Sequence, residues 1–79
     1  MPGKPSPLQL LGQRIREMRK SKNLTQEDLA HESDIDRSYI GGVERGERNL
    51  SFEKLCQIAQ ALRCDVAALT KDLPEAPRR

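Results

Sequence analysis

Residues 25–44, TQEDLAHESDIDRSYIGGVE, predict two short helices joined by a sharp turn, and no other segment constrains the fold as strongly. Thr25 can cap the first of these helices, and Asp28 can return the hydrogen bond in a variant capping box. Asp34 tolerates the left-handed backbone of a tight turn, and Asp36 can cap the second helix. The apolar residues spaced to pack these helices together are Leu29, Ala30, Ile35, Ile40 and Val43. We therefore expect two crossed helices that share one apolar seam.

The composition favours an all-α domain. The chain has 79 residues, enough for one small domain with a modest core. Its aromatic residues are Tyr39 and Phe52 alone and it has no Trp, so Leu, Ile, Val, Met and Ala must supply that core. No pair of segments with alternating apolar residues indicates strands. A helix bundle is therefore expected rather than a β-sandwich.

The segment before the two-helix unit predicts an arm and a first helix. Residues 1–7 contain three prolines and should form a flexible arm. A helix is expected from Leu8 to about Ser21, and Pro7 suits its first turn. The apolar residues that recur there at steps of three and four are Leu8, Leu11, Ile15 and Met18.

Two further helices are expected after the unit. Gly46 is placed to end the second helix of the unit, and Ser51 can cap the next one. The apolar face of that next helix comprises Phe52, Leu55, Ile58, Ala59 and Leu62. Asp65 can cap a short last helix from Val66 to about Lys71. The expected divisions of the chain are the arm 1–7, a domain 8–73 and a flexible tail 74–79.

Basic residues are concentrated in two places, although the net charge is only +2. One group, on the first helix and its end, comprises Arg14, Arg16, Arg19, Lys20 and Lys22. The other, around the helix that follows Asp36, comprises Arg37, Arg45 and Arg48. A positive charge at a helix N-terminus opposes the macrodipole, so Arg37 is a poor stabiliser there. From such a helix an Arg can bond both O6 and N7 of guanine in the major groove.

Other classes of function find little support in the sequence. A single His, no nucleophile motif and no Gly-rich phosphate loop argue against an enzyme. Cys56 and Cys64 lack metal-ligand spacing and His31 stands alone, so no metal or other cofactor is expected. The two thiols suit core positions better than a disulfide or redox pair. No apolar run or signal segment indicates a membrane, so we expect a cytoplasmic protein.

Four stretches of the chain resemble the Cro/C1 (XRE) type of helix-turn-helix domain, which phage repressors and many small bacterial regulators share. They are TQEDLA, DRSYI, VERGERNLS and LCQIAQAL, and the likeness covers residues 13–70. Within that family, DRSYI and the RNL that follows it are most similar to the controller proteins of restriction-modification systems. The resemblance implies a five-helix all-α fold and a transcriptional regulator, either repressor or activator, that binds double-stranded DNA at specific sequences.

The resemblance implies DNA contacts by residues of the two-helix unit. Gln26 would hold a phosphate at a helix N-terminus, where backbone N–H groups attract anions. Arg37 would read guanine, and Ser38 beside it would meet a base or a phosphate. Further phosphate contacts are expected from Lys22, Tyr39, Arg45, Arg48 and Asn49. Each of these could instead be an ordinary surface residue, and Tyr39 could equally be half-buried packing.

Gly41 and Gly42 leave two interpretations open. Each should cost about 1 kcal/mol relative to Ala inside a helix. Close approach of the helix to the groove, with both glycines beside the bases, would offset that cost, and a frayed helix end is the alternative. The family often has Ser or Lys in this stretch, so base readout would depend on Arg37 and on DNA shape.

The resemblance also implies a salt bridge and a dimer. Arg19 would form a partly buried salt bridge with Glu44, which would keep that carboxylate away from phosphates. One short helix contacts too few base pairs to select a genomic site, so we expect a homodimer on an inverted repeat. In this family the dimer surface usually involves the last helix and the loop before it. The apolar residues available there are Leu50, Val66, Leu69 and Leu73, although Leu69 could belong to the core.

The sequence also leaves partners other than DNA open. With no effector domain, such a protein would act through its own concentration, as a small autoregulator. Exposed acidic residues leave a contact with RNA polymerase open, and they are Glu27, Asp28, Glu32 and Glu47. The alternative function is a helix-turn-helix module that binds a protein such as a toxin or a polymerase subunit. The basic residues around the second helix of the unit favour DNA over that alternative.

Overall fold

The computed structural model describes residues 3–74 and contains five helices and no strand within that range. The helices are α1 (Pro7–Ser21), α2 (Gln26–Ser33), α3 (Arg37–Glu44), α4 (Phe52–Ala61) and α5 (Val66–Thr70). The expectation of a five-helix all-α fold is confirmed. Residues 1–2 of the expected arm and residues 75–79 of the expected tail lie outside the described residues.

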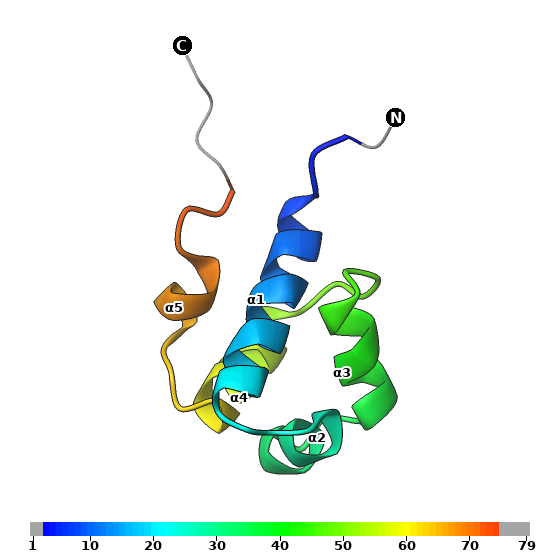
Figure 1. Ribbon diagram of the computed structural model, residues 1–79, viewed down its shortest axis with the longest axis vertical. Coiled ribbons are helices and arrows are strands. Elements are labelled where there is room, and N and C mark those ends of the chain that lie inside the picture. The colour runs from blue at the N-terminus through cyan, green and yellow to red at the C-terminus, as the bar shows by residue number, and fades with distance from the viewer. Residues whose placement is uncertain (1–2, 75–79) are drawn as a thin grey trace.

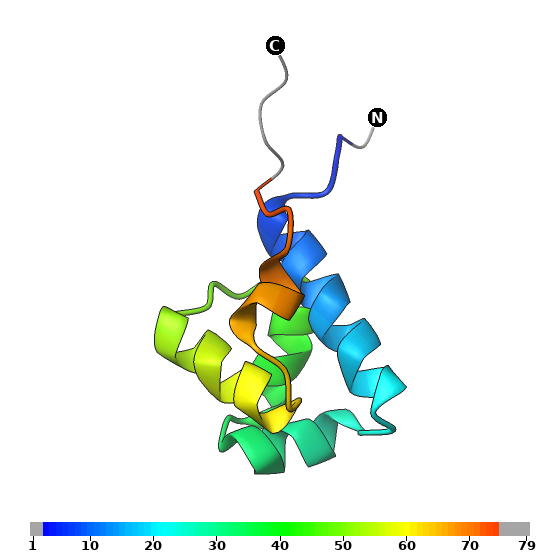
Figure 2. The same cartoon turned by 90° about the vertical axis from the view of Figure 1, so that its left-hand side faces the viewer.

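The helices pack around one apolar core, with α1 in the middle of the molecule (Figure 1). In that view α3 lies to the right, α2 crosses the bottom and α5 lies to the left. A quarter turn shows α4 on the side away from α1, with α5 between them (Figure 2). α2 packs on α3 and α4, while α1 packs on α3 and α5. This arrangement leaves one side of α3 open.

The predicted helix caps of the two-helix unit are present. Thr25 and Asp28 form the reciprocal capping box: the N–H of Asp28 donates to the Thr25 hydroxyl at 3.0 Å, and the N–H of Thr25 donates to the Asp28 carboxylate at 2.9 Å. Asp34 has the left-handed backbone expected of the turn, with φ of 59°. The Asp36 carboxylate accepts from the N–H of Ser38 at 3.1 Å. The local sequence therefore sets both the start of each helix and the sharp angle between them.

α1 begins one residue earlier than expected, because Ser6 caps it. The Ser6 hydroxyl accepts from the N–H of Gln9, and the Gln9 side chain accepts from the N–H of Ser6, at 3.1 and 2.8 Å. Ser6 and Gln9 match the Ser-x-x-Gln capping signature, which indicates a helix that begins at Pro7. Pro7 occupies the first helical position, as its fixed φ favours.

The buried side chains form a single core shared by all five helices. Its apolar members are Ile15, Leu29, Ala30, Ile35, Ile40, Val43, Leu55, Ile58, Ala59, Leu62 and Leu69. Phe52 corrects one expectation, because it was assigned to the apolar face of α4 but is 71% exposed. It is the first residue of α4 and lies one turn ahead of Leu55, the first core residue of that helix. The spacing of apolar residues along a helix indicates which face of the helix is apolar. It does not indicate how far along the helix the core extends.

α5 is fastened to α1 by Arg14. This side chain was expected on the basic outer surface of α1, but its Nη1 donates to the carbonyl oxygen of Leu69 at 3.3 Å and to that of Lys71. Carbonyl groups at a helix C-terminus lack intrahelical partners, and an Arg satisfies them well. Arg14 is therefore a structural tie rather than a free cation. Within residues 3–74, no helix has the length and apolar character needed to span a membrane.

Candidate nucleic-acid interface

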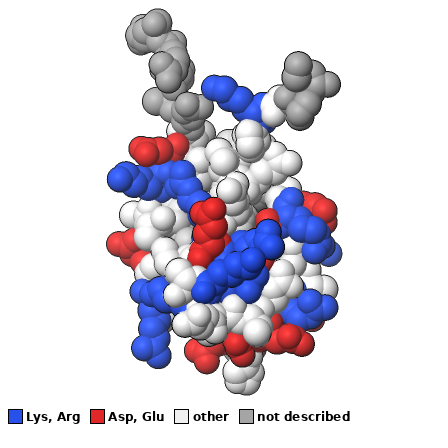
Figure 3. Space-filling view, viewed as in Figure 1, with Lys and Arg blue, Asp and Glu red and all other residues white. Residues whose placement is uncertain are grey.

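The open side of the molecule is formed by α3 and the N-terminus of α2. Basic side chains lie over α1 and α3 on the face shown in Figure 3, while acidic side chains gather at the bottom, over α2. Arg37 and Ser38, at the start of α3, are both exposed, and Gln26, at the start of α2, is half-buried. The fold therefore brings the predicted reader and the predicted phosphate contact to one surface.

The predicted salt bridge between Arg19 and Glu44 is present and buried. Arg19 Nε donates to Glu44 Oε2 at 2.7 Å, and Nη2 donates to Oε1 at 3.0 Å. The exposed fractions of the two side chains are 9% and 2%. Arg19 Nη1 also donates to the carbonyl oxygen of Leu24, at 2.8 Å. The hydrogen bonds that Arg19 donates to Glu44 raise the pKa of Arg19 above its usual value. The pair thus ties α1 to the end of α3, and it neutralises the Glu44 charge.

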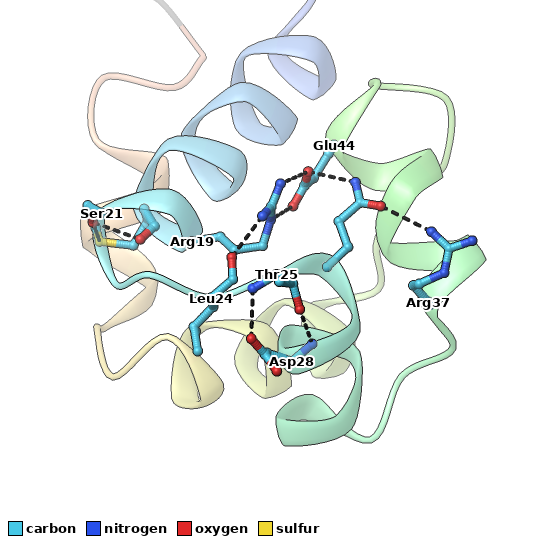
Figure 4. Close-up of polar contacts among 9 residues, drawn as sticks. Arg19, Ser21, Leu24, Thr25, Asp28, Arg37 and Glu44 are labelled. Atoms are coloured by element: carbon cyan, nitrogen blue, oxygen red, sulfur yellow. Dashed lines mark hydrogen bonds and ion pairs between the residues drawn. The ribbon is translucent and has the colours of Figure 1, made fainter.

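Gln26 continues this network from Glu44 to Arg37. Figure 4 shows Arg19, Glu44 and Arg37 in this row of contacts. Its Nε2 donates to Glu44 Oε1 at 3.0 Å, which orients the amide so that Oε1 faces Arg37. Arg37 Nη1 donates to that oxygen at 3.3 Å. Gln26 keeps one amide N–H free of these bonds, and Arg37 keeps most of its five donors. The exposed Arg37 is therefore positioned by Gln26, which is itself held by the buried ion pair.

Ser38 is already engaged at the start of α3. Its hydroxyl and its backbone N–H both donate to the Asp36 carboxylate. These bonds, with the hydroxyl bond the larger cause, lower the pKa of Asp36 below its usual 3.8. A hydroxyl that donates to Asp36 still has lone pairs to accept from a base amino group. Ser38 thus suits contact with a base donor better than contact with a phosphate.

Tyr39 connects α3 to the loop that precedes α4. Its hydroxyl donates to the carbonyl oxygen of Asn49 at 2.6 Å. The guanidinium of Arg48 lies 5.5 Å from the centre of the ring, and the ammonium of Lys54 lies 5.3 Å from it. Sequence reasoning missed Lys54, although its charge in the first turn of α4 opposes the macrodipole just as that of Arg37 does. Arg48, Asn49 and Lys54 therefore form one cluster around the ring of Tyr39.

Gly41 and Gly42, which were expected to lie beside the bases, do not present an open backbone surface in the free protein. Both are buried, because side chains from elsewhere lie across them. A Cβ on Gly41 would lie 3.1 Å from Arg45 Nη1, and a Cβ on Gly42 would lie 2.7 Å from Arg48 Cγ. Arg45 also pairs with Glu47 at 3.0 Å, but both side chains are more than half exposed, and such pairs are easily broken. The outer surface of α3 is thus lined by arginine side chains laid over glycines.

Five other predicted residues remain: Lys22 and the dimer candidates Leu50, Val66, Leu69 and Leu73. Lys22 lies beside a hollow lined also by Leu62 and Arg63, at the opposite end of α1 from the arm. Leu69, predicted for the dimer surface, is fully buried in the core and is not available to a partner. It belongs to a short helix that packs on both α1 and α4, which explains that burial. The remaining predicted dimer residues, Leu50, Val66 and Leu73, are half-buried.

The cysteines and the histidine do not form a site. Cys56 and Cys64 are free and half-buried, and burial raises the pKa of the Cys64 thiol. His31 is exposed on α2. Among residues 3–74 no group of His, Cys, Asp and Glu side chains is placed to hold a metal ion.

These features define a class of protein. Residues 15–69 match the helix-turn-helix family HTH_3, which is most of the chain. The chain therefore belongs to the helix-turn-helix family of DNA-binding transcriptional regulators. It is 48% identical over 54 residues to the control protein C.BamHI of Bacillus amyloliquefaciens, a match that covers 67% of each chain.

Solved structures of similar proteins also include controller proteins. The restriction-modification controller protein C.AhdI from Aeromonas hydrophila is 50% identical, with a TM-score of 0.77 over 78% of this chain and 94% of that one. The controller protein C.Esp1396I, solved as a tetramer with its natural 35 base-pair operator, is 36% identical with a TM-score of 0.77. That match covers 84% of this chain and 87% of the other. The resemblance to controller proteins expected from the sequence is confirmed.

Proposed function

We propose that this regulator binds an inverted-repeat operator as a homodimer, with α3 in the major groove and Arg37 reading guanine. The observation that carries the proposal is the row of contacts from Arg19 through Glu44 and Gln26 to Arg37. An Arg held at one end keeps its remaining donors for O6 and N7 of guanine, and less side-chain entropy is lost on binding. Ser38 lies beside it as a second candidate for base contact.

The phosphate contacts are proposed to surround this reader. Gln26 has a free amide N–H, and it lies at the N-terminus of an eight-residue helix whose first N–H groups favour an anion. Arg45, Arg48 and Asn49 lie at the other end of α3 and in the loop after it, and Lys54 lies in the first turn of α4; together they can follow a DNA strand. Lys22 lies beside Leu62 and Arg63 and is left out of the proposed set.

The dimer surface is proposed to include Phe52. An exposed Phe is costly to leave in water, and neighbouring Leu50 is only half-buried. Val66 and Leu73 are the other half-buried apolar residues of the predicted surface. The C.Esp1396I structure shows that a similar protein assembles on DNA. Two copies would place their α3 helices about one helical turn apart, roughly 34 Å.

The biological setting is proposed to be a restriction-modification system, in which the protein controls its own gene in the cytoplasm. The similarity to C.BamHI and C.AhdI supports this setting. A contact with RNA polymerase is also proposed, through the acidic side chains over α2, which include Glu27, Asp28 and Glu32. Methyltransferase or endonuclease genes beside the gene of this protein would support the setting.

Selection from a pool of random duplexes tests the DNA-binding proposal. The protein is incubated with the pool, bound duplexes are recovered and amplified, and the enriched sequences are determined. We expect an inverted repeat with guanine in each half-site, bound by two chains as measured by sedimentation. Recovery of unrelated sequences, or binding by a single chain, would contradict the proposal.

A further inference from the structure

Gly42 lies directly beneath the side chain of Arg48. A Cβ added to Gly42 would lie 2.7 Å from Arg48 Cγ and 3.6 Å from its Nε. Cγ is only two bonds from the Arg48 backbone, so bending the far end of the side chain would not relieve this overlap. A side chain at position 42 would therefore displace Arg48 from α3.

The backbone on both sides of Arg48 is tied to α3. The N–H of Glu47 donates to the carbonyl oxygen of Gly42 at 2.8 Å. On the other side, the hydroxyl of Tyr39 donates to the carbonyl oxygen of Asn49 at 2.6 Å. These bonds hold the loop against the helix, so it cannot lift away without losing them. The room that Gly42 leaves is thus what allows Arg48 to lie flat on α3.

In this position Arg48 shares the ring of Tyr39 with a second cation. The guanidinium carbon of Arg48 lies 5.5 Å from the ring centre, and Lys54 Nζ lies 5.3 Å from it. Each contact is a favourable cation–π interaction. Two cations gathered around one ring make this part of the surface positively charged, and an anion bound beside them would be attracted to both. DNA supplies such an anion in its phosphates.

We infer that Gly42 is a positioning residue that builds a phosphate clamp from Arg48, Tyr39 and Lys54 before DNA is bound. The inference rests on the proposed function, and it gives Gly42 a role other than base readout. Because the clamp is assembled in the free protein, little side-chain entropy remains to be lost when the phosphate arrives. This role offsets the poor helix propensity of Gly42.

A double-mutant cycle with a matched control tests the inference. Gly42→Ala and the control Gly41→Ala make the same chemical change at neighbouring positions of α3. A Cβ on Gly41 would lie 3.1 Å from the flexible end of Arg45 and in ordinary van der Waals contact, at 3.6 Å, with Gln26 Oε1. Its nearest neighbours include no atom of Arg48, so the control should leave Arg48 in place. Arg48→Ala is then made in the wild-type, Gly42→Ala and Gly41→Ala backgrounds. Circular dichroism checks folding, and we expect neither alanine to lower Tm, because Ala favours a helix.

Two measurements follow on these variants. The first is the ring-current shift of the Arg48 side-chain protons by NMR without DNA. Tyr39 is the only Tyr and the chain has no Trp, and repeating the measurement with Phe52→Leu excludes a contribution from the one Phe. We expect upfield shifts in wild type and Gly41→Ala, and none in Gly42→Ala. The second is the affinity for a random-sequence duplex across a salt series. In Gly42→Ala the negative slope of log K against log salt should become shallower by about 0.9, as expected for the loss of one phosphate contact.

The double-mutant cycle distinguishes a failure of the proposed role of Gly42 from a failure of the proposed DNA-binding function. Arg48→Ala should weaken binding several-fold in the wild-type and Gly41→Ala backgrounds, and have no further effect in Gly42→Ala. An equal effect of Arg48→Ala in all three backgrounds would overturn the role of Gly42. Unshifted Arg48 protons in the wild type would overturn it as well. If the wild type bound no DNA at all, the proposed function itself would fail, whatever the NMR result.

Discussion

Replacing Glu44 with Gln should destabilise the protein strongly, because it removes the charge that balances buried Arg19. The Glu44 carboxylate accepts three hydrogen bonds, two from Arg19 and one from Gln26. A Gln side chain has one acceptor oxygen, and its NH₂ group would face donors of Arg19. Both side chains of the pair are at least nine-tenths buried, so solvent screens little of the unbalanced charge. Breaking such a pair costs about 3 kcal/mol.

That cost is large for a chain of this size. A domain of 79 residues is expected to have a free energy of unfolding of roughly 4–12 kcal/mol. The variant should therefore lose a quarter or more of its stability, and its Tm should fall by roughly 12–24 °C. The assay is urea denaturation followed by circular dichroism, with the double variant Arg19→Met, Glu44→Leu as the control. Replacing both charges by apolar side chains should restore most of the stability. A Glu44→Gln variant with unchanged stability and unchanged DNA affinity would refute the role of this pair.

Three further predictions concern packing, pH and assembly. Gly12→Ala should destabilise the fold by about 1–3 kcal/mol in urea denaturation, because its Cβ would lie 2.2 Å from the carbonyl oxygen of Val43. Wild-type stability should fall as the pH drops below about 4, because backbone and side-chain hydrogen bonds of Thr25 lower the pKa of Asp28 below its usual 3.8. Asp28→Asn should flatten that fall in a series of Tm measurements, and an unchanged slope would contradict the assignment. Phe52→Ser should weaken dimerisation in sedimentation experiments while leaving the far-ultraviolet circular dichroism unchanged.

Features that depend on neighbours in the chain were predictable from the sequence. Thr25, Asp36, Ser51 and Asp65 all cap helices as expected, because a cap needs only a side-chain oxygen and N–H groups two or three residues later. The same reasoning applied to Ser6 would have found the true start of α1. The contact of Arg19 with Glu44 came from the family resemblance, since 25 residues separate the two in the chain.

Features that depend on packing between helices were less accessible. Phe52 was misplaced because periodicity shows an apolar face but not whether a neighbouring helix covers it. For the same reason the sequence left Leu69 open between the dimer surface and the core, and the structure buries it. The burial of Gly41 and Gly42 depends on where the arginines of α3 and the following loop lie, which no local pattern specifies. Lys54 reaches the candidate interface only because α4 packs its first turn near Tyr39.

The most direct measurement of specific DNA recognition compares Arg37→Ala with wild type on two duplexes. Dissociation constants are measured by fluorescence anisotropy for the selected operator and for a random sequence of the same length and salt concentration. If Arg37 reads guanine, the variant should lose about 1–3 kcal/mol of discrimination between the two duplexes while its affinity for the random duplex changes little. Gln26→Ala, as the phosphate-contact control, should weaken both complexes alike. An equal loss on both duplexes for Arg37→Ala would contradict the assignment of Arg37 as the reader.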